Sequence, residues 1–115
     1  MEEWRSFEVF GIGIAVEKYI DNAVRNISRF AELLSLVGLR EVGENYKKEA
    51  EKLDHDRSEQ AVNEIRNWIR GTFKYQGSGS IPDRYVAKED GSADLRLTSE
   101  YHELISILGD FVEGH

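Results

Sequence analysis

The three histidines are the side chains of this chain best suited to acid–base or metal chemistry near neutral pH. His55 stands between Asp54 and Asp56, and two carboxylates beside an imidazole can raise its pKa or share a metal ion with it. Adjacent residues in a turn rarely converge on one ion, however, and no second ligand pair has the spacing of a known site. We therefore interpret His55 as part of a solvated turn and His102 as a surface residue, and we predict no catalytic residue, no metal and no cofactor.

Nucleophilic catalysis would have to use serine or threonine, because the chain contains no cysteine. The run over residues 77–80 (Gly-Ser-Gly-Ser) lacks the Gly-x-Ser-x-Gly spacing of a nucleophile elbow and the hydrophobic strand that precedes one. Its backbone amides can cradle an anion, but the lysine of a phosphate-binding loop is missing. We interpret the run as a flexible bend and expect a protein that is not an enzyme.

A basic stretch raises the question of nucleic-acid binding. Arg66, Arg70 and Lys74 follow one another at four-residue spacing, with aromatic residues nearby that can stack on bases. Trp68, one of these aromatics, falls on an apolar helical stripe, which favours a place in the core. Three cations in a chain of net charge −7 provide too little positive charge to hold a phosphate backbone, so we predict no nucleic-acid partner.

Helices are the elements that must position these residues. Apolar side chains recur at three- and four-residue steps over residues 16–37, which predicts one long helix closed by Gly38. A second stripe over residues 39–53 predicts the next helix. Asp56 and Glu59 have the spacing of a capping box, which predicts that a third helix opens there.

Residues 74–97 lose the helical period and contain the glycine-rich run, the only proline and an Asp-Gly pair, so we predict a long loop. Within this loop, the pattern of residues 84–87 predicts a short strand or an extended edge. Thr98 or Ser99 then caps a last helix. The alternation over residues 7–10 predicts either an N-terminal strand or an irregular lead-in to the first helix.

Four helices that are each hydrophobic on one face must bury those faces together. A chain of 115 residues, 40% of them apolar, suffices for one modest core. We therefore predict a mainly α fold with a single helical domain over residues 1–115. It is a small four-helix bundle-like domain with the loop of residues 74–97 between its third and fourth helices.

Charge gives the first functional constraint. Residues 41–64 hold eight acids against four bases, and residues 97–115 hold four acids and no lysine or arginine. An acidic surface repels phosphate backbones and anionic lipids and attracts basic proteins, although it can also serve only to keep a protein in solution. No apolar run approaches the ~20 residues that span a bilayer, and the acidic start is unlike a secretory signal. We expect a soluble cytoplasmic domain without a membrane partner.

Both acidic blocks offer carboxylates to a partner protein. The predicted partner-binding residues are Glu41, Glu44, Glu49, Glu51 and Asp54 in the second helix, and Glu100, Tyr101, Glu103, Asp110 and Glu113 in the fourth. Interface energy concentrates in a few aromatic or arginine residues, which makes Tyr101 and Tyr46 candidate anchors. Both tyrosines also fit their helical stripes, so core and interface both remain open for them.

Two short motifs resemble a family of small bacterial domains of unassigned function. Residues 42–45 (Val-Gly-Glu-Asn) are similar to the start of that family's second helix, and residues 77–83 are similar to its Gly-x-Gly-Ser-x-x-Asp turn. The likeness covers residues 27–112 and implies a helical first half, the turn after the third helix and a closing helix. Pro82 stands where the family usually has asparagine, so the resemblance assigns that position no role.

In general character the chain is similar to the immunity proteins of bacterial toxin systems, including contact-dependent growth inhibition. Those proteins are typically small, acidic, cytoplasmic and poor in cysteine, and they bind a cognate toxin domain. The likeness implies an immunity protein that neutralises a basic, nuclease-type toxin by stoichiometric binding, as a monomer or weak homodimer. One alternative is an adaptor or regulatory domain that binds a housekeeping partner, or binds itself through the segment of Trp4, Phe7 and Phe10. Another is an enzyme that uses His55 or His102.

Overall fold

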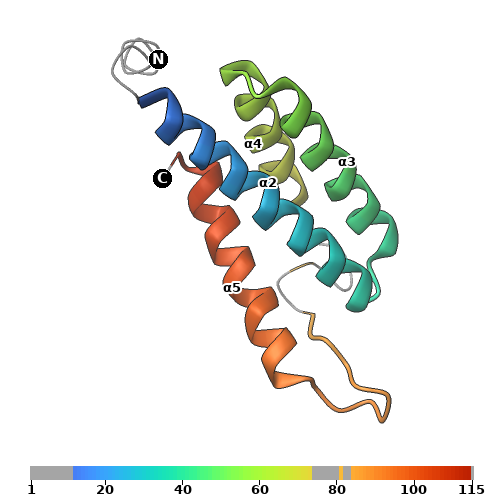
Figure 1. Ribbon diagram of the computed structural model, residues 1–115. Coiled ribbons are helices and arrows are strands. Elements are labelled where there is room, and N and C mark those ends of the chain that lie inside the picture. Colours follow the sequence, from blue (N-terminus) through green and yellow to red (C-terminus); the bar gives the residue numbers. More distant parts are fainter. Residues whose placement is uncertain (1–11, 74–80, 82–83, 115) are drawn as a thin grey trace.

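Four α-helices dominate the computed structural model, which describes residues 12–73, 81 and 84–114 (Figure 1). They are α2 (Ile12–Leu36), α3 (Arg40–Asp56), α4 (Glu59–Phe73) and α5 (Leu95–Val112). The predicted mainly α fold, with its loop between the third and fourth helices, is confirmed. The predicted N-terminal strand and the glycine-rich turn lie outside the described residues.

The central helix is α2, which lies between α3 and α5 in Figure 1, with α4 behind it. Fully buried side chains follow its inward stripe: Ile20, Ile27, Phe30, Leu33 and Leu34. The ring of Phe30 lies 5.2 Å from that of Tyr46 on α3 and 5.4 Å from that of Tyr101 on α5. One aromatic side chain therefore joins three helices, at ring distances favourable for aromatic pairs.

Gly38 ends α2, as predicted. Its φ of +89° lies in the left-handed region, which a residue without a Cβ enters at little cost. The amide of Leu39 donates to the carbonyl of Leu34 at 2.8 Å, and that of Gly38 donates to Ser35 at 3.2 Å. This pair of bonds is a Schellman motif, and it turns the chain so that α3 packs back along α2.

The predicted start of the third helix is wrong. Asp56 belongs to the last turn of α3, and the cap of α4 is Ser58, whose Oγ accepts a hydrogen bond from the amide of Ala61 at 3.0 Å. Arg57 ends α3 in the left-handed conformation, so the chain leaves the helix only there. Ser58 is then the first residue that can cap α4.

The last helix also begins earlier than predicted. Asp94 caps α5 by accepting a hydrogen bond from the amide of Leu97 at 3.0 Å, so the helix starts three residues before Thr98. The hydroxyl of Thr98 instead accepts a hydrogen bond from the amide of Val86 at 2.9 Å. Thr98 therefore fastens the loop to α5 and does not cap the helix.

The loop before α5 takes the extended form of the prediction. Ala87 and Ala93 make an isolated antiparallel bridge, and the described residues form no strand. The amide of Asp94 donates to the carbonyl of Val86 at 2.7 Å, which continues the same pairing. Val86 is buried, so this short hairpin packs one side against the core.

Candidate partner-binding surface

Tyr101 and Tyr46 lie in the core, so the assignment of Tyr101 to the binding surface is wrong. Neither side chain has any exposed area. The hydroxyl of Tyr101 donates to the carbonyl of Ile81 at 2.7 Å, and that of Tyr46 bonds to the hydroxyl of Thr72. Burial raises the pKa of Tyr101 to about 12, and it raises the pKa of Tyr46 as well. Both residues hold helices together and are not available to a partner.

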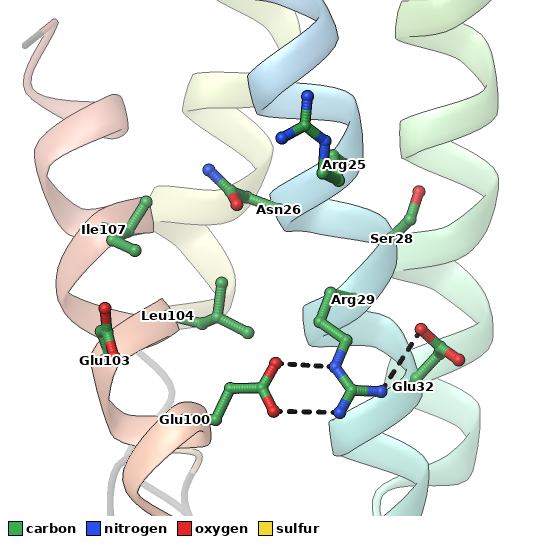
Figure 2. A pocket seen from close by; sticks show the side chains of 9 residues that line it. All are labelled: Arg25, Asn26, Ser28, Arg29, Glu32, Glu100, Glu103, Leu104 and Ile107. Atoms are coloured by element: carbon green, nitrogen blue, oxygen red, sulfur yellow. Dashed lines mark hydrogen bonds and ion pairs between the residues drawn. The ribbon is translucent and has the colours of Figure 1, made fainter. Parts of the chain in front are cut away.

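Glu100 faces α2 across a groove, where Arg29 binds its carboxylate (Figure 2). The Nε of Arg29 donates to Oε2 at 2.7 Å and its Nη2 donates to Oε1 at 2.9 Å, a bidentate ion pair. The hydrogen bond from Arg29 holds the pKa of Glu100 below its ordinary value. Glu100 is therefore a link between α2 and α5 and not a free acid.

The groove between α2 and α5 has a volume of about 520 Å³. Its lining residues are Arg25, Asn26, Ser28, Arg29, Glu32, Glu100, Glu103, Leu104 and Ile107. Figure 2 shows the arginines on the α2 wall and the acids Glu100 and Glu103 on the α5 wall. Leu104 and Ile107 add apolar surface, so the groove combines an apolar base with a charged rim, as protein interfaces do. Periodicity gave no signal for this groove, because its two walls come from distant parts of the chain.

Three acids of α5 are exposed and make no ion pair with any described residue: Glu103, Asp110 and Glu113. We call them the free acids of α5. Asp110 lies in the last turn of the helix and Glu113 is its C-cap. The dipole of a helix makes this end negative, so carboxylates are unfavourable there. The stability of α5 therefore does not explain why Asp110 and Glu113 are acids.

Two arginines of α4 reach the same end of α5 but bind its backbone. The Nε of Arg66 donates to the carbonyl of Phe111 at 2.9 Å, and Nη2 of Arg70 donates to that of Val112 at 3.1 Å. The guanidinium of Arg66 also lies over the rings of Tyr19 and Phe111. Two of the three cations in the predicted basic stretch, Arg66 and Arg70, thus bind backbone carbonyls at the C-terminal end of α5. Its third member, Lys74, lies outside the described residues.

The surface of α3 is mixed in charge. Its exposed acids without an ion pair to any described residue are Glu41, Glu44, Glu51 and Asp56. Its exposed bases include Arg40, Lys47 and Lys48. Glu49 is half-buried and pairs with Lys52 at 3.1 Å. Cations on the same helix therefore offset the acids that the sequence placed there.

Asp54 belongs to a cluster of ion pairs around Arg57. The guanidinium of Arg57 reaches Asp54, Asp21 and Glu17, each at 2.6 Å. These hydrogen bonds raise the pKa of Arg57, with the bond to Asp54 contributing most. The cluster ties the first half of α2 to the turn between α3 and α4, so Asp54 has a structural partner.

The histidines remain apart from these features. His55 is exposed in the last turn of α3, not in the interhelical turn that the sequence suggested, and His102 is exposed on α5. Nε2 of His102 lies 3.2 Å from the carbonyl oxygen of Arg84. Over the part of the chain that the structure describes, no group of three His, Asp or Glu side chains could hold a metal ion.

Comparisons of the chain with models of protein families, with curated proteins and with solved structures found no match. None of the helices that the structure describes is long and apolar enough to cross a bilayer. Of the two acidic helices, α5 carries the more uniform charge, because no lysine or arginine follows Arg96 on it. Because α2 lies between α3 and α5, their acids line two separate grooves along α2: Glu44 and Glu51 on the α3 side, Glu100 and Glu103 on the α5 side (Figure 1).

Proposed function

We propose that this chain is a non-enzymatic binding domain of the cytoplasm that engages a basic partner protein through the free acids of α5. The supporting observation is that Glu103, Asp110 and Glu113 are exposed and form no ion pair with any described residue. The last two also stand at a helix end where the dipole disfavours negative charge. In the most specific form of the proposal, the partner is a nuclease-type toxin domain. The chain is then its immunity protein and blocks the toxin by stoichiometric binding without turnover.

The spacing of the free acids suits recognition of a basic surface. Glu103 and Asp110 are seven residues apart, which places them on one side of α5 and about 10.5 Å apart along its axis. No lysine or arginine follows Arg96 on this helix to offset them. Such a row of charge steers a cationic partner and raises its association rate above the ~10⁵–10⁶ M⁻¹s⁻¹ of unsteered docking.

The test compares two triple charge reversals that change the net charge by the same amount. One replaces the free acids of α5 (Glu103→Lys, Asp110→Lys and Glu113→Lys), and the control replaces exposed acids of α3 (Glu41→Lys, Glu44→Lys and Glu51→Lys). The partner is recovered with the wild-type chain from its own cells and identified by mass spectrometry. Association and dissociation rates are then measured at several salt concentrations.

We expect the α5 triple variant to associate with the partner at least about tenfold more slowly than the wild type at low salt. The association rate of the α3 triple variant should fall by a smaller factor. Raising the salt concentration should slow association of the wild type far more than dissociation. For the immunity function, production of the partner alone should arrest growth, and the wild-type chain should restore it. An equal fall in association rate in both triple variants would contradict the choice of α5. A partner whose production does not arrest growth would contradict the immunity function.

A further inference from the structure

We propose that a second surface, at the end of the bundle opposite to Asp110 and Glu113, is a weak homodimer interface. Three large hydrophobic side chains stand out by exposure among the described residues: Leu36 at 54%, Tyr85 at 51% and Leu95 at 78%. We call them the apolar end patch. Leu36 is the last residue of α2 and Leu95 the first of α5. These two helix ends lie toward the same end of the bundle in Figure 1.

The loop brings Tyr85 to this end as well. The guanidinium of Arg84 donates to the carbonyl of Val37 at 2.8 Å, which holds the neighbouring Tyr85 near the end of α2. The bridge between Ala87 and Ala93 sets the register of the hairpin, and its pairing extends to Val86 and Asp94, whose chain neighbours are Tyr85 and Leu95.

The hairpin presents this pair outward and holds it in place. Side chains alternate between the two faces of an extended segment, so the burial of Val86 directs Tyr85 to solvent. The hydrogen bond between Val86 and Thr98 anchors the same segment to α5. Little conformational entropy is left to lose when a partner covers the pair, which favours binding.

The occupant that we propose is a second copy of the chain, because the charge around the patch does not oppose it. Residues 84–96 contain three bases and three acids, which cancel, although the whole chain carries −7. Two copies that met through α5 would bring unpaired acids together, whereas the apolar end patch meets its copy without net repulsion. A twofold axis at the patch can set Tyr85 of one copy against Leu95 of the other, and both apolar side chains then leave water.

The small size of the patch implies a weak dimer. Three side chains fall far short of the ~20–30 residues a side that a stable interface uses. We therefore expect a dissociation constant on the order of 10–100 µM, which sedimentation equilibrium resolves. Salt should strengthen this dimer, because it screens the repulsion between two acidic molecules while leaving the apolar contact intact.

The first experiment measures the monomer–dimer equilibrium of the full chain. The double variant Tyr85→Ser and Leu95→Ser should raise the dissociation constant at least about tenfold. A control with neutral changes at exposed positions elsewhere, Asn63→Ser and Ser106→Ala, should leave it unchanged. A chain that stays monomeric at 1 mM at every salt concentration would overturn the proposal. So would a dissociation constant that is the same for the double variant and the wild type.

The second experiment uses the absence of cysteine from the chain, which makes any introduced thiol unique. Leu95→Cys and Tyr85→Cys variants, mixed under mild oxidation, should form a disulfide-linked dimer. The exposed Ser106→Cys variant should not cross-link under the same conditions. Cross-linking that is equally fast at position 106 would show random collision and would overturn the interface. Both results are independent of the proposed toxin partner, since neither experiment contains one.

Discussion

Gly43 occupies a point where the backbone of α3 comes close to that of α2. A Cβ at this position would lie 2.7 Å from the carbonyl oxygen of Ala31 and 3.0 Å from Oγ of Ser35. Real Cβ atoms essentially never approach backbone oxygen so closely, so any side chain here pushes the helices apart. The glycine of the Val-Gly-Glu-Asn motif therefore has a packing role.

Gly43→Ala should lower the free energy of unfolding by about 1–3 kcal/mol, because overpacking displaces one helix from the other. Gly71→Ala is the matched control, since a Cβ at Gly71 of α4 meets nothing within 4 Å. That variant should gain about 0.5–1 kcal/mol from its higher helix propensity. Urea denaturation measures both, and a loss of the same size at Gly71 would refute the packing role of Gly43.

The buried hydroxyl of Tyr101 makes stability depend on alkaline pH. Its pKa of about 12 lies above the ordinary value of 10, so the neutral phenol stabilises the fold fully below pH 10 and progressively less as pH rises toward 12. Tyr101→Phe should cost about 1–2 kcal/mol at pH 7, because the carbonyl of Ile81 loses its donor. The difference from the wild type should shrink between pH 10 and 12. A constant difference across this range would refute the linkage.

At the scale of elements, the ion pair between Arg29 and Glu100 links α2 to α5. The two side chains are 38% and 37% exposed, so solvent screens the pair and it contributes about 0.2–1 kcal/mol. The pKa of Glu100 is lowered, so this contribution is present above about pH 4.5 and is lost as pH falls through the folded-state value. Glu100→Gln should therefore be less stable than the wild type at pH 7 and equal to it near pH 2.

Glu103→Gln is the control for that comparison, since Glu103 lies one turn away and makes no ion pair with any described residue. It should match the wild type at both pH values. Thermal denaturation of the three proteins across pH 2–7 gives the result. A loss in Glu103→Gln equal to that in Glu100→Gln would show a general charge effect and not a specific pair.

Arg57 joins elements in a different way, because it ends α3 in a left-handed conformation with φ of +54° and also binds three acids. Arg57→Ala and Arg57→Gly both remove the ion pairs, but only alanine keeps the strain of a Cβ in this region. The alanine variant should therefore have the lower denaturant midpoint. Equal midpoints would show that the left-handed conformation relaxes once the cluster is gone.

At the scale of the whole molecule, α5 has two different ends. Glu103 lies at its middle and Asp110 and Glu113 at its C-terminal end, whereas its first residue belongs to the neutral apolar end patch. The two surfaces should act independently. The triple charge reversal on α5 should not weaken the dimer, and the Tyr85→Ser and Leu95→Ser variant should keep the wild-type association rate with a basic partner. Loss of both functions in either variant would show one shared surface.

Apolar periodicity by itself determined the four helices, because one-sided burial imposes a three- and four-residue repeat on any helix of a small bundle. The sequence also predicted the end of α2 at Gly38. The caps Ser58 and Asp94 were missed, because several polar residues near each helix start compete for the same amides. Only the fold decides which of them reaches the first turn.

Which acids are free was decided by tertiary structure alone. Glu100 and Glu103 are identical in type, but only Glu100 meets an arginine of another helix, Arg29 of α2. The sequence likewise left open whether Tyr101 lies in the core or at an interface. In the fold its ring stacks on Phe30 and its hydroxyl donates to the carbonyl of Ile81, which places it in the core. The physical reason is the same in each case: helical periodicity is a local property, whereas ion pairs and buried hydrogen bonds join residues that only the packed fold brings together.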